Sequence, residues 1–247
     1  MMTRITLEVC VDDTAGIAAA AKGGADRLEL CAALALGGLT PSTGLMRLAA
    51  ESRVPTLAMI RPRSGDFVWI RRERAAMRAE IAAARAERLA GVVIGANLPD
   101  GRLDAETLSD LMAEAEGMDI ALHRAIDLTP DVSEALSLCR ELGIRRVLSS
   151  GGAPTAVEGI DRLAQMQGQG VTIMPGSGVS ADNVAQLDAR LRLTEVHASC
   201  SGPLPVPQDP KVRGFGFQPA GARGTDAARV AGMRALLDQI TASRPAG

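Results

Sequence analysis

The sequence lacks any long uncharged apolar segment. Its Ala-rich stretches are interrupted by Arg, Glu or Gly well before the roughly 18 apolar residues that a membrane helix needs. No apolar run followed by a small-residue cleavage site precedes the first strand-like pattern, so no secretory signal is indicated. We therefore expect a soluble, cytoplasmic protein that has no membrane partner.

The chain also lacks an excess of charge of either sign. Its 27 Lys and Arg residues nearly balance its 29 Asp and Glu residues, which gives a formal net charge of −2. This balance provides no electrostatic reason to expect nucleic acid as a partner. We expect a small ligand instead.

Cysteine and histidine are both scarce. The 247 residues include four cysteines, none of them in a C-x-x-C pair, and this pattern is typical of reduced thiols in a cytosolic protein. The two histidines, His123 and His197, both fall at the ends of strand-like segments. With so few of these residues, their positions carry more information than their number.

Short β-type runs alternate with longer segments of helical period, and this alternation predicts βαβ units on a parallel sheet. Eight strands match a single (β/α)₈ TIM barrel, for which a length of 247 residues and a hydrophobic fraction of 47% are ample. We expect one barrel domain over 1–247. The predicted strands are Ile5–Val11, Arg27–Cys31, Thr56–Arg61, Gly91–Ala96, Asp119–Arg124, Arg146–Ser150, Thr172–Gly176 and Glu195–Ser199.

Helical periodicity predicts helices at Arg71–Leu89, Asp131–Leu142 and Asp226–Ser243. Asp104 and Ser133 are candidate N-caps, and Gly143 is a candidate C-cap. The Pro- and Gly-rich stretch at about 201–224 is too long for an ordinary barrel loop. We expect it to be an ordered flap or a mobile segment near the mouth of the barrel.

Polar residues recur at the ends of the first two predicted strands, in Leu7-Glu8-Val9-Cys10 and Leu28-Glu29-Leu30-Cys31. Residues two apart share a face of a strand, and the C-terminal mouth is where barrels build active sites. Both Glu-x-Cys pairs are therefore expected to point into the mouth. Alternatively, the carboxylates belong to a structural salt-bridge network and the cysteines are small core residues.

Three arginines at other strand ends, Arg61, Arg63 and Arg124, are candidate counter-charges for the carboxylates or candidate anion ligands. Asp127 follows Arg124 closely and is expected in the same group. Glu8, Glu29, His123 and His197 are the candidate acid–base groups.

Glycines follow the seventh predicted strand, in Gly176-Ser177-Gly178, and Ser199 follows the eighth. Barrels often hold a phosphate at this place, where open backbone N–H groups face the ligand. These residues are therefore a candidate anion site. The alternative is a tight turn that leads into the next helix.

Taken together, these motifs resemble those of the CutC family. The resemblance rests on Leu-Glu-Val-Cys, on Gly24-Ala25-Asp26-Arg27-Leu28-Glu29-Leu30-Cys31-Ala32, on Arg61-Pro62-Arg63-x-Gly65-Asp66-Phe67, on His123-Arg124-Ala125-x-Asp127 and on Glu195-Val196-His197-x-Ser199. It extends from about Glu8 to Ser199. It implies a (β/α)₈ barrel, a cytoplasmic location, a homo-oligomer (dimer or tetramer) and a role in copper homeostasis, with Cys10 and Cys31 as the Cu(I) ligands.

Three hypotheses remain open at this point. In the first, thiolates at the mouth bind Cu(I), a soft ion that prefers sulfur ligands. In the second, the protein is an enzyme that acts on a small anionic or phosphorylated metabolite through Glu and His acid–base groups and Arg anion clamps. In the third, it is a silent scaffold that acts by oligomerising.

Overall fold

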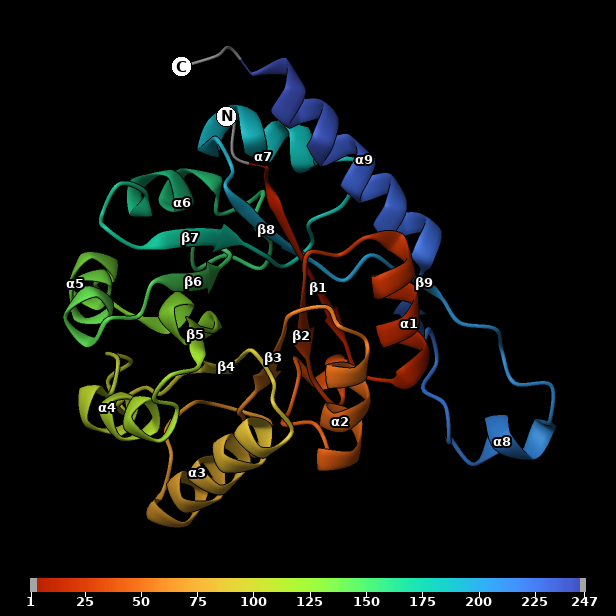
Figure 1. Ribbon diagram of the computed structural model, residues 1–247, viewed down its shortest axis with the longest axis horizontal. Coiled ribbons are helices and arrows are strands. Elements are labelled where there is room, and N and C mark those ends of the chain that lie inside the picture. Colours follow the sequence, from red (N-terminus) through yellow and green to blue (C-terminus); the bar gives the residue numbers. More distant parts are fainter. Residues whose placement is uncertain (1–3, 245–247) are drawn as a thin grey trace.

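A computed structural model describes residues 4–244. Eight parallel strands form its central sheet, in the order β7-β6-β5-β4-β3-β2-β1-β8, and β7 lies beside β8, so that the sheet curves into a nearly closed barrel (Figure 1). This arrangement confirms the predicted (β/α)₈ fold. The strands are β1 Thr6–Val11, β2 Arg27–Leu30, β3 Thr56–Met59, β4 Gly91–Ile94, β5 Asp119–Leu122, β6 Arg146–Ser149, β7 Thr172–Pro175 and β8 Glu195–Ala198.

Helices surround the strands and cover their outer faces. A helix follows each of the first seven strands, and the last long helix, α9 Ala227–Ser243, packs against α1 to complete the ring. Within residues 4–244, no helix is both long enough and apolar enough to cross a membrane. The other helices of the ring are α1 Thr14–Gly23, α2 Thr43–Glu51, α3 Arg71–Ala86, α4 Ala105–Glu114, α5 Val132–Leu142, α6 Ile160–Met166 and α7 Val184–Leu191.

All eight predicted strands are present, but seven of the eight extend one or two residues less at their C-terminal ends than predicted. Among the residues past these ends, Arg61 lines the mouth, whereas Cys31 is fully buried and its N–H still donates to the Val11 carbonyl at 2.8 Å. The Arg71–Leu89 helix also ends early, at Ala86, and Arg88 adopts a left-handed conformation with φ of 60°.

Side-chain caps account for the helix boundaries. Asp104 accepts a hydrogen bond from the Thr107 N–H, and Gly143 ends α5 in a left-handed conformation, as predicted. The Ser133 prediction is wrong, because α5 begins earlier. Asp131 is the N-cap and accepts hydrogen bonds from the N–H groups of Ser133 and Glu134.

Alternation along the strands separates two interior layers. Leu7, Val9, Leu28 and Leu30 point outward into the core between sheet and helices. The apolar side chains inside the barrel form a smaller cluster of Cys31, Leu57, Met59, Val93 and Ala121. Bulky branched residues usually fill a barrel interior, so this small cluster leaves room for polar groups.

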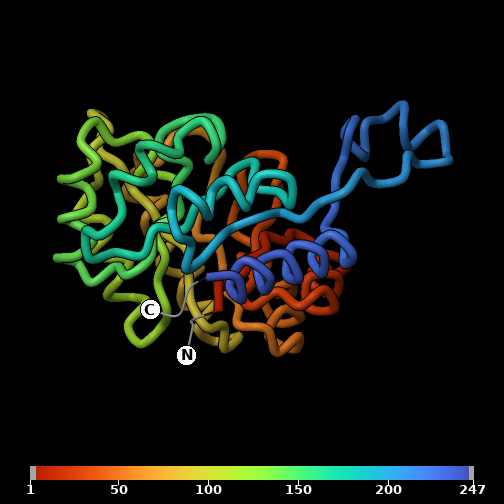
Figure 2. The backbone as a smooth tube through the Cα atoms, turned by 90° about the horizontal axis from the view of Figure 1, so that it is seen from above, coloured from red at the N-terminus to blue at the C-terminus, as the bar shows by residue number. Residues whose placement is uncertain are grey.

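The stretch after β8, expected as an ordered flap or a mobile segment, contains short elements of secondary structure. Two short strands, β9 Ser201–Pro203 and β10 Arg223–Thr225, pair antiparallel. Residues 204–222, here called the arm, connect them and include the short helix α8 Pro210–Gly214. Figure 2 shows the arm projecting away from the barrel, whereas β9 and β10 remain at its edge.

Gly91 at the start of β4 provides a test of the strand packing. A Cβ atom there would lie 2.1 Å from the carbonyl oxygen of Asp119 on β5. We expect Gly91→Ala to lower the free energy of unfolding by about 2–3 kcal/mol, because the backbone of β5 would have to move. The measurement is denaturant unfolding.

Gly232, on the exposed side of α9, is the matched control. A Cβ atom there meets no other atom within 4 Å. Gly232→Ala should therefore raise the free energy of unfolding by roughly 0.5–1 kcal/mol through helix propensity. A Gly91→Ala protein as stable as the wild type would contradict the described β4–β5 contact.

Candidate functional site

A chain of ion pairs crosses the barrel interior below the mouth. Arg146 on β6 contacts Asp119 at 2.8 Å and Glu195 at 2.6 Å. Arg27 on β2 continues the chain, since its guanidinium group contacts Glu195 at 2.5 Å and also pairs with Glu8. Buried charges are costly unless paired, so Arg27, Glu8 and Glu195 depend on one another, whereas Asp119 at the end of the chain of ion pairs is exposed.

Arg27 is thus the counter-charge of Glu8, a role that the sequence analysis assigned to Arg61, Arg63 or Arg124. The signal was available, because Arg27 precedes Glu29 by two residues and so shares its face of β2. Burial alone would raise the pKa of Glu8, but the hydrogen bond from His197 and the charge of Arg27 lower it well below its usual range. Glu8 is therefore a carboxylate held by its partners.

His197 on β8 lies between the two carboxylates predicted to face the mouth. Its Nδ1 atom is 2.9 Å from Glu8 Oε1, and its Nε2 atom is 3.7 Å from Glu29 Oε2. Burial alone would lower the pKa of His197, but Glu29, Cys10 and Glu8 together raise it well above its usual value. The carboxylates thus fix both the orientation and the charge preference of the ring.

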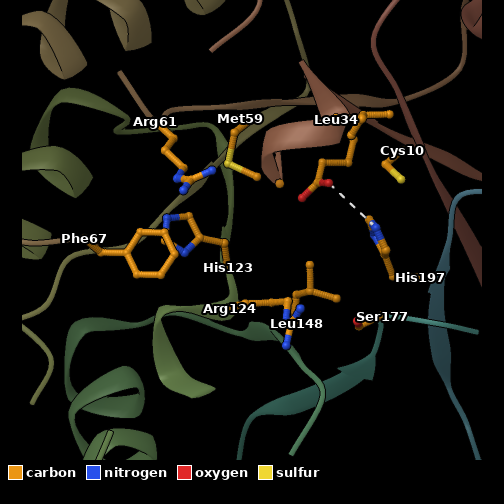
Figure 3. Close-up of a pocket in the computed structure, with 12 residues that line it drawn as sticks. Cys10, Leu34, Met59, Arg61, Phe67, His123, Arg124, Leu148, Ser177 and His197 are labelled. Atoms are coloured by element: carbon orange, nitrogen blue, oxygen red, sulfur yellow. Dashed lines mark ion pairs between the residues drawn. The ribbon is translucent and has the colours of Figure 1, made fainter. Parts of the chain in front are cut away.

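Cys10, Glu29 and His197 form the group of potential metal ligands in the described chain. Their ligand atoms all lie within 4.8 Å of one another. Adjacent strands bring them together, because Cys10 is the register partner of Glu29 and Glu8 is the register partner of His197. Figure 3 shows Cys10 and His197 on one side of the pocket, with a dashed line from His197 for its approach to Glu29.

Cys31 lies outside this group. Its Sγ atom is 3.6 Å from Glu29 Oε2 and packs against Gly38, and the residue is fully buried. Burial and the nearby Glu29 raise the pKa of the Cys31 thiol well above its usual value.

His123 faces the same cavity from the opposite side. Its Nδ1 atom accepts a hydrogen bond from the Ala125 N–H at 3.1 Å, which places the proton of the neutral ring on Nε2. Burial and the charge of Arg61 lower the pKa of His123 to about 3. Gly95 makes room for the ring, since a Cβ atom there would lie 2.1 Å from His123 Cε1.

The two arginines after β3 differ in role. Arg61 donates to the carbonyl oxygens of Leu36, Gly38 and Gly65 at 2.9–3.0 Å, and its guanidinium group lies 5.2 Å from the Phe67 ring centre, beside the cavity. Arg63 does not line the cavity. It pairs instead with Asp66 at 2.8 Å and with Glu73 at 2.6 Å.

Arg124 lines the cavity and is held by Asp127, which contacts its Nε atom at 2.8 Å. The Asp127 carboxylate also accepts hydrogen bonds from the Ser149 hydroxyl at 2.6 Å and from the Gly152 N–H at 3.0 Å. Asp127 therefore joins the ends of β5 and β6 and positions Arg124.

The glycine-containing loop after β7 divides between two cavities. Ser177 lines the inner cavity with φ of 73°, and its hydroxyl donates to the Pro154 carbonyl at 2.7 Å. Gly178 borders a separate cavity together with Ser199. The Gly176 N–H donates to the Ser149 carbonyl at 3.0 Å, so it is not open to a ligand.

The inner cavity has a volume of about 200 Å³. Three buried polar atoms around it have no partner within residues 4–244: Glu29 Oε1, Arg61 Nε and His123 Nε2. Buried polar atoms are nearly always hydrogen-bonded, so three orphans at one cavity indicate a polar ligand or ordered water. The lining residues are Cys10, Glu29, Leu34, Gly37, Met59, Arg61, Phe67, His123, Arg124, Leu148, Ser177 and His197.

Sequence reasoning missed the apolar part of this lining. Phe67 stacks on His123 with a ring-centre distance of 4.5 Å, and Leu34 and Leu148 complete the walls (Figure 3). Phe67 belongs to the motif that begins at Arg61, but nothing in the sequence indicates that its ring contacts His123, 56 residues away. Met59 both packs in the barrel interior and lines the cavity.

Comparison with known proteins identifies close relatives. The sequence profile of the CutC family matches residues 5–202. A CutC family protein of Rhizobium meliloti is 52% identical over 240 residues, covering 96% of this chain and 98% of that protein. One from Agrobacterium fabrum is 49% identical over 235 residues, covering 94% and 93%.

A solved structure supports the same family assignment. The CutC protein of Streptococcus agalactiae, to which a role in copper homeostasis is provisionally assigned, superposes with a TM-score of 0.75 at 27% identity, covering 79% of this chain and 98% of that one. The profile, the relatives and the fold agree. The chain belongs to the CutC family.

Proposed function

We propose that the mouth of the barrel binds Cu(I), with Cys10 and His197 as its principal ligands. The observation that carries this proposal is the cluster in which the ligand atoms of Cys10, Glu29 and His197 lie within 4.8 Å of one another. Thiolate sulfur and imidazole nitrogen suit a soft ion, whereas the oxygen of Glu29 contributes mainly charge. Copper is the cargo in this proposal.

The surroundings of His197 support a ligand role. Its Nδ1 atom is bound to Glu8, which leaves Nε2 for a metal ion. A carboxylate on the far nitrogen is the usual second-shell partner of a metal-binding histidine, because it fixes the ring and raises its basicity. The ion-pair chain through Arg27 thus supports the site from below.

The second thiolate inferred from the family resemblance, Cys31, takes no part in this proposal. Its sulfur packs against Gly38, where a Cβ atom would lie only 2.9 Å away, and it is closed off from solvent. Joining Cys10 at a metal ion would require repacking of this segment. The site proposed here therefore has one thiolate.

A second candidate function is the binding and conversion of a small polar metabolite. The three orphaned atoms at the inner cavity favour it. Arg61 Nε and neutral His123 Nε2 would donate hydrogen bonds to an oxygen of the ligand, and Glu29, whose pKa is raised chiefly by burial, would exchange a proton. Glu8 would position His197 and would not transfer protons itself.

The expected homo-oligomer and the cytoplasmic location remain predictions. The arm supports the former, because Val206, Phe215 and Phe217 are more than two-thirds exposed. Large exposed apolar side chains grouped on one segment are typical of contacts between proteins. We infer that a second copy of the chain covers them.

Anaerobic Cu(I) titration against a competing chelator tests the copper proposal. We expect Cys10→Ser to weaken Cu(I) binding by roughly 100-fold or more, since changes in the second shell alone cost about 10–100-fold. Cys31→Ser should bind like the wild type, and Cys139→Ala on α5 is the control for a buried thiol. Unchanged affinity in the Cys10→Ser, Cys31→Ser double variant would rule out copper binding at the mouth.

Native mass spectrometry of protein isolated from cells tests the metabolite candidate, because copper and a retained metabolite would be detected in the same sample. We expect a small polar compound on the wild type that is lost from His123→Asn. The asparagine keeps an acceptor for the Ala125 N–H but removes the Nε2 donor. A wild-type protein carrying no compound from cells would count against this candidate.

The low pKa of His123 predicts a pH dependence of stability. The unfolded chain binds a proton at this residue near pH 6.5, whereas the folded protein binds it only near pH 3. Unfolding therefore takes up a proton between these values, and stability is fully present above about pH 6.5 and falls as the pH is lowered.

Wild-type unfolding free energies measured from pH 4 to pH 6 should therefore have a slope that is more positive than that of His123→Asn by about 1.4 kcal/mol per pH unit. Comparing the two proteins removes the contributions of His197 and the carboxylates, which both share. Equal slopes would show that His123 titrates normally in the folded protein.

A further inference from the structure

Two further cavities follow the inner one in succession. The first, of about 440 Å³, shares Cys10 and Leu34 with the inner cavity, and residues 219–225 at the base of the arm form its outer wall. The second, of about 370 Å³, shares Ser199, Ser201 and Arg223 with the first. Their common lining residues place the three cavities in succession from His123 to the first turn of α9, and this succession is here called the cleft.

Two arginines stand at the far end of this cleft. Arg223 on β10 donates from Nε to the Ser201 hydroxyl at 3.0 Å and from its terminal nitrogen to the Ser201 carbonyl at 2.6 Å. Arg229 lies against the other side of β9, where a Cβ atom on Gly202 would be 3.3 Å from its Nε atom. Both arginines line the outermost cavity, together with the hydroxyls of Ser199 and Ser201.

The electrostatics of this end favour an anion. Arg229 is in the first turn of α9, which holds no acidic residue, and the positive end of the helix dipole disfavours a cation there. Two carboxylates are near. Asp226 caps α9 by accepting the Arg229 N–H at 2.9 Å, and Asp182 lines the cavity, yet within residues 4–244 neither forms an ion pair with Arg223 or Arg229.

We propose that Arg223 and Arg229, with Ser199 and Ser201, bind the phosphate end of a phosphate monoester whose other end occupies the inner cavity. Two guanidinium groups and two hydroxyls suit a tetrahedral dianion better than a planar carboxylate. The anion site expected from Gly176, Ser177 and Gly178 thereby moves outward. Ser199 remains a ligand and Gly178 remains at the edge of the site, whereas the two arginines were not among the candidate site residues.

This inference rests on the second candidate function, since it names the class of metabolite that the cleft would accept. It also has a consequence for the arm. The end of the arm and β10, which follows it, wall the space above Cys10, and β10 supplies Arg223. The segment after β8 would therefore take part in the site, although the tip of the arm projects into solvent.

Titration with inorganic phosphate at constant ionic strength, followed by calorimetry, tests the outer site alone. We expect saturable binding with one phosphate per chain, weakened roughly tenfold or more by Arg229→Gln and further by the Arg223→Gln, Arg229→Gln double variant. Arg213→Gln is the matched control, because it removes the same charge from the arm, where Arg213 donates to the Pro207 and Gln208 carbonyls. Its affinity for phosphate should equal that of the wild type.

The inference would be overturned if the double variant bound phosphate as tightly as the wild type, or if it lost no more affinity than Arg213→Gln. It would also be overturned if only Arg124→Gln weakened phosphate binding, because the anion would then lie in the inner cavity. Failure of the metabolite candidate is distinguishable. In that case native mass spectrometry would find no compound from cells that binds the wild type and is lost from His123→Asn. Phosphate binding at the outer site does not involve His123 and would be unaffected.

Discussion

The pairing of Arg27 with Glu8 and Glu195 is the constraint on which the rest of the site depends. A barrel interior normally excludes charge, and here three strands place ionised groups inside it. Removing one member of such a chain leaves an uncompensated buried charge, which is far more costly than removing the whole chain. These ion pairs, here called the floor of the barrel, are therefore a single electrostatic unit, which shares the barrel interior with the small apolar cluster that includes Ala121.

This floor explains why the mouth is asymmetric. On the side of β1 and β8, Glu8 fixes His197, and His197 approaches Glu29, so that the ion-pair chain extends upward into the lining. On the side of β3 and β5, the terminal nitrogens of Arg61 donate to backbone carbonyls, its Nε atom has no partner within residues 4–244, and His123 is neutral. One side thus resembles a metal site and the other an array of hydrogen-bond donors. The same cavity contains both.

The sequence predicted the barrel and its eight strands because alternation between β and helical periods is a local property. It also predicted that Cys10, Glu29, His123 and His197 lie at the mouth, since strand ends in a parallel barrel converge, and these four line the cavity. Glu8 lies below them in the ion-pair chain. The ion-pair partners of the arginines could not be predicted in this way, because they depend on contacts between segments that are distant in the sequence. Arg27 on β2 pairs with Glu8 on β1 and Glu195 on β8, which lie far from it in the sequence. Arg63 turns toward Glu73 in α3, a contact set by the path of the loop. Cys31 mirrors Cys10 in sequence but lies past the end of β2, where Gly38 packs over its sulfur.

Glu29 connects the two candidate functions physically. One oxygen of its carboxylate, Oε2, faces His197 and Cys31, whereas the other, Oε1, is buried and has no partner in the described chain. A cation held by Cys10 and His197 would lie near the carboxylate, and a polar ligand held by Arg61 and His123 would reach its free oxygen. The two functions therefore do not require two sites. If the polar ligand also contacted the metal ion, Oε2 would lie near the ion and Oε1 would accept a hydrogen bond from the ligand. Any further group of the ligand would then extend past Cys10 into the next cavity, because Cys10 lines both cavities.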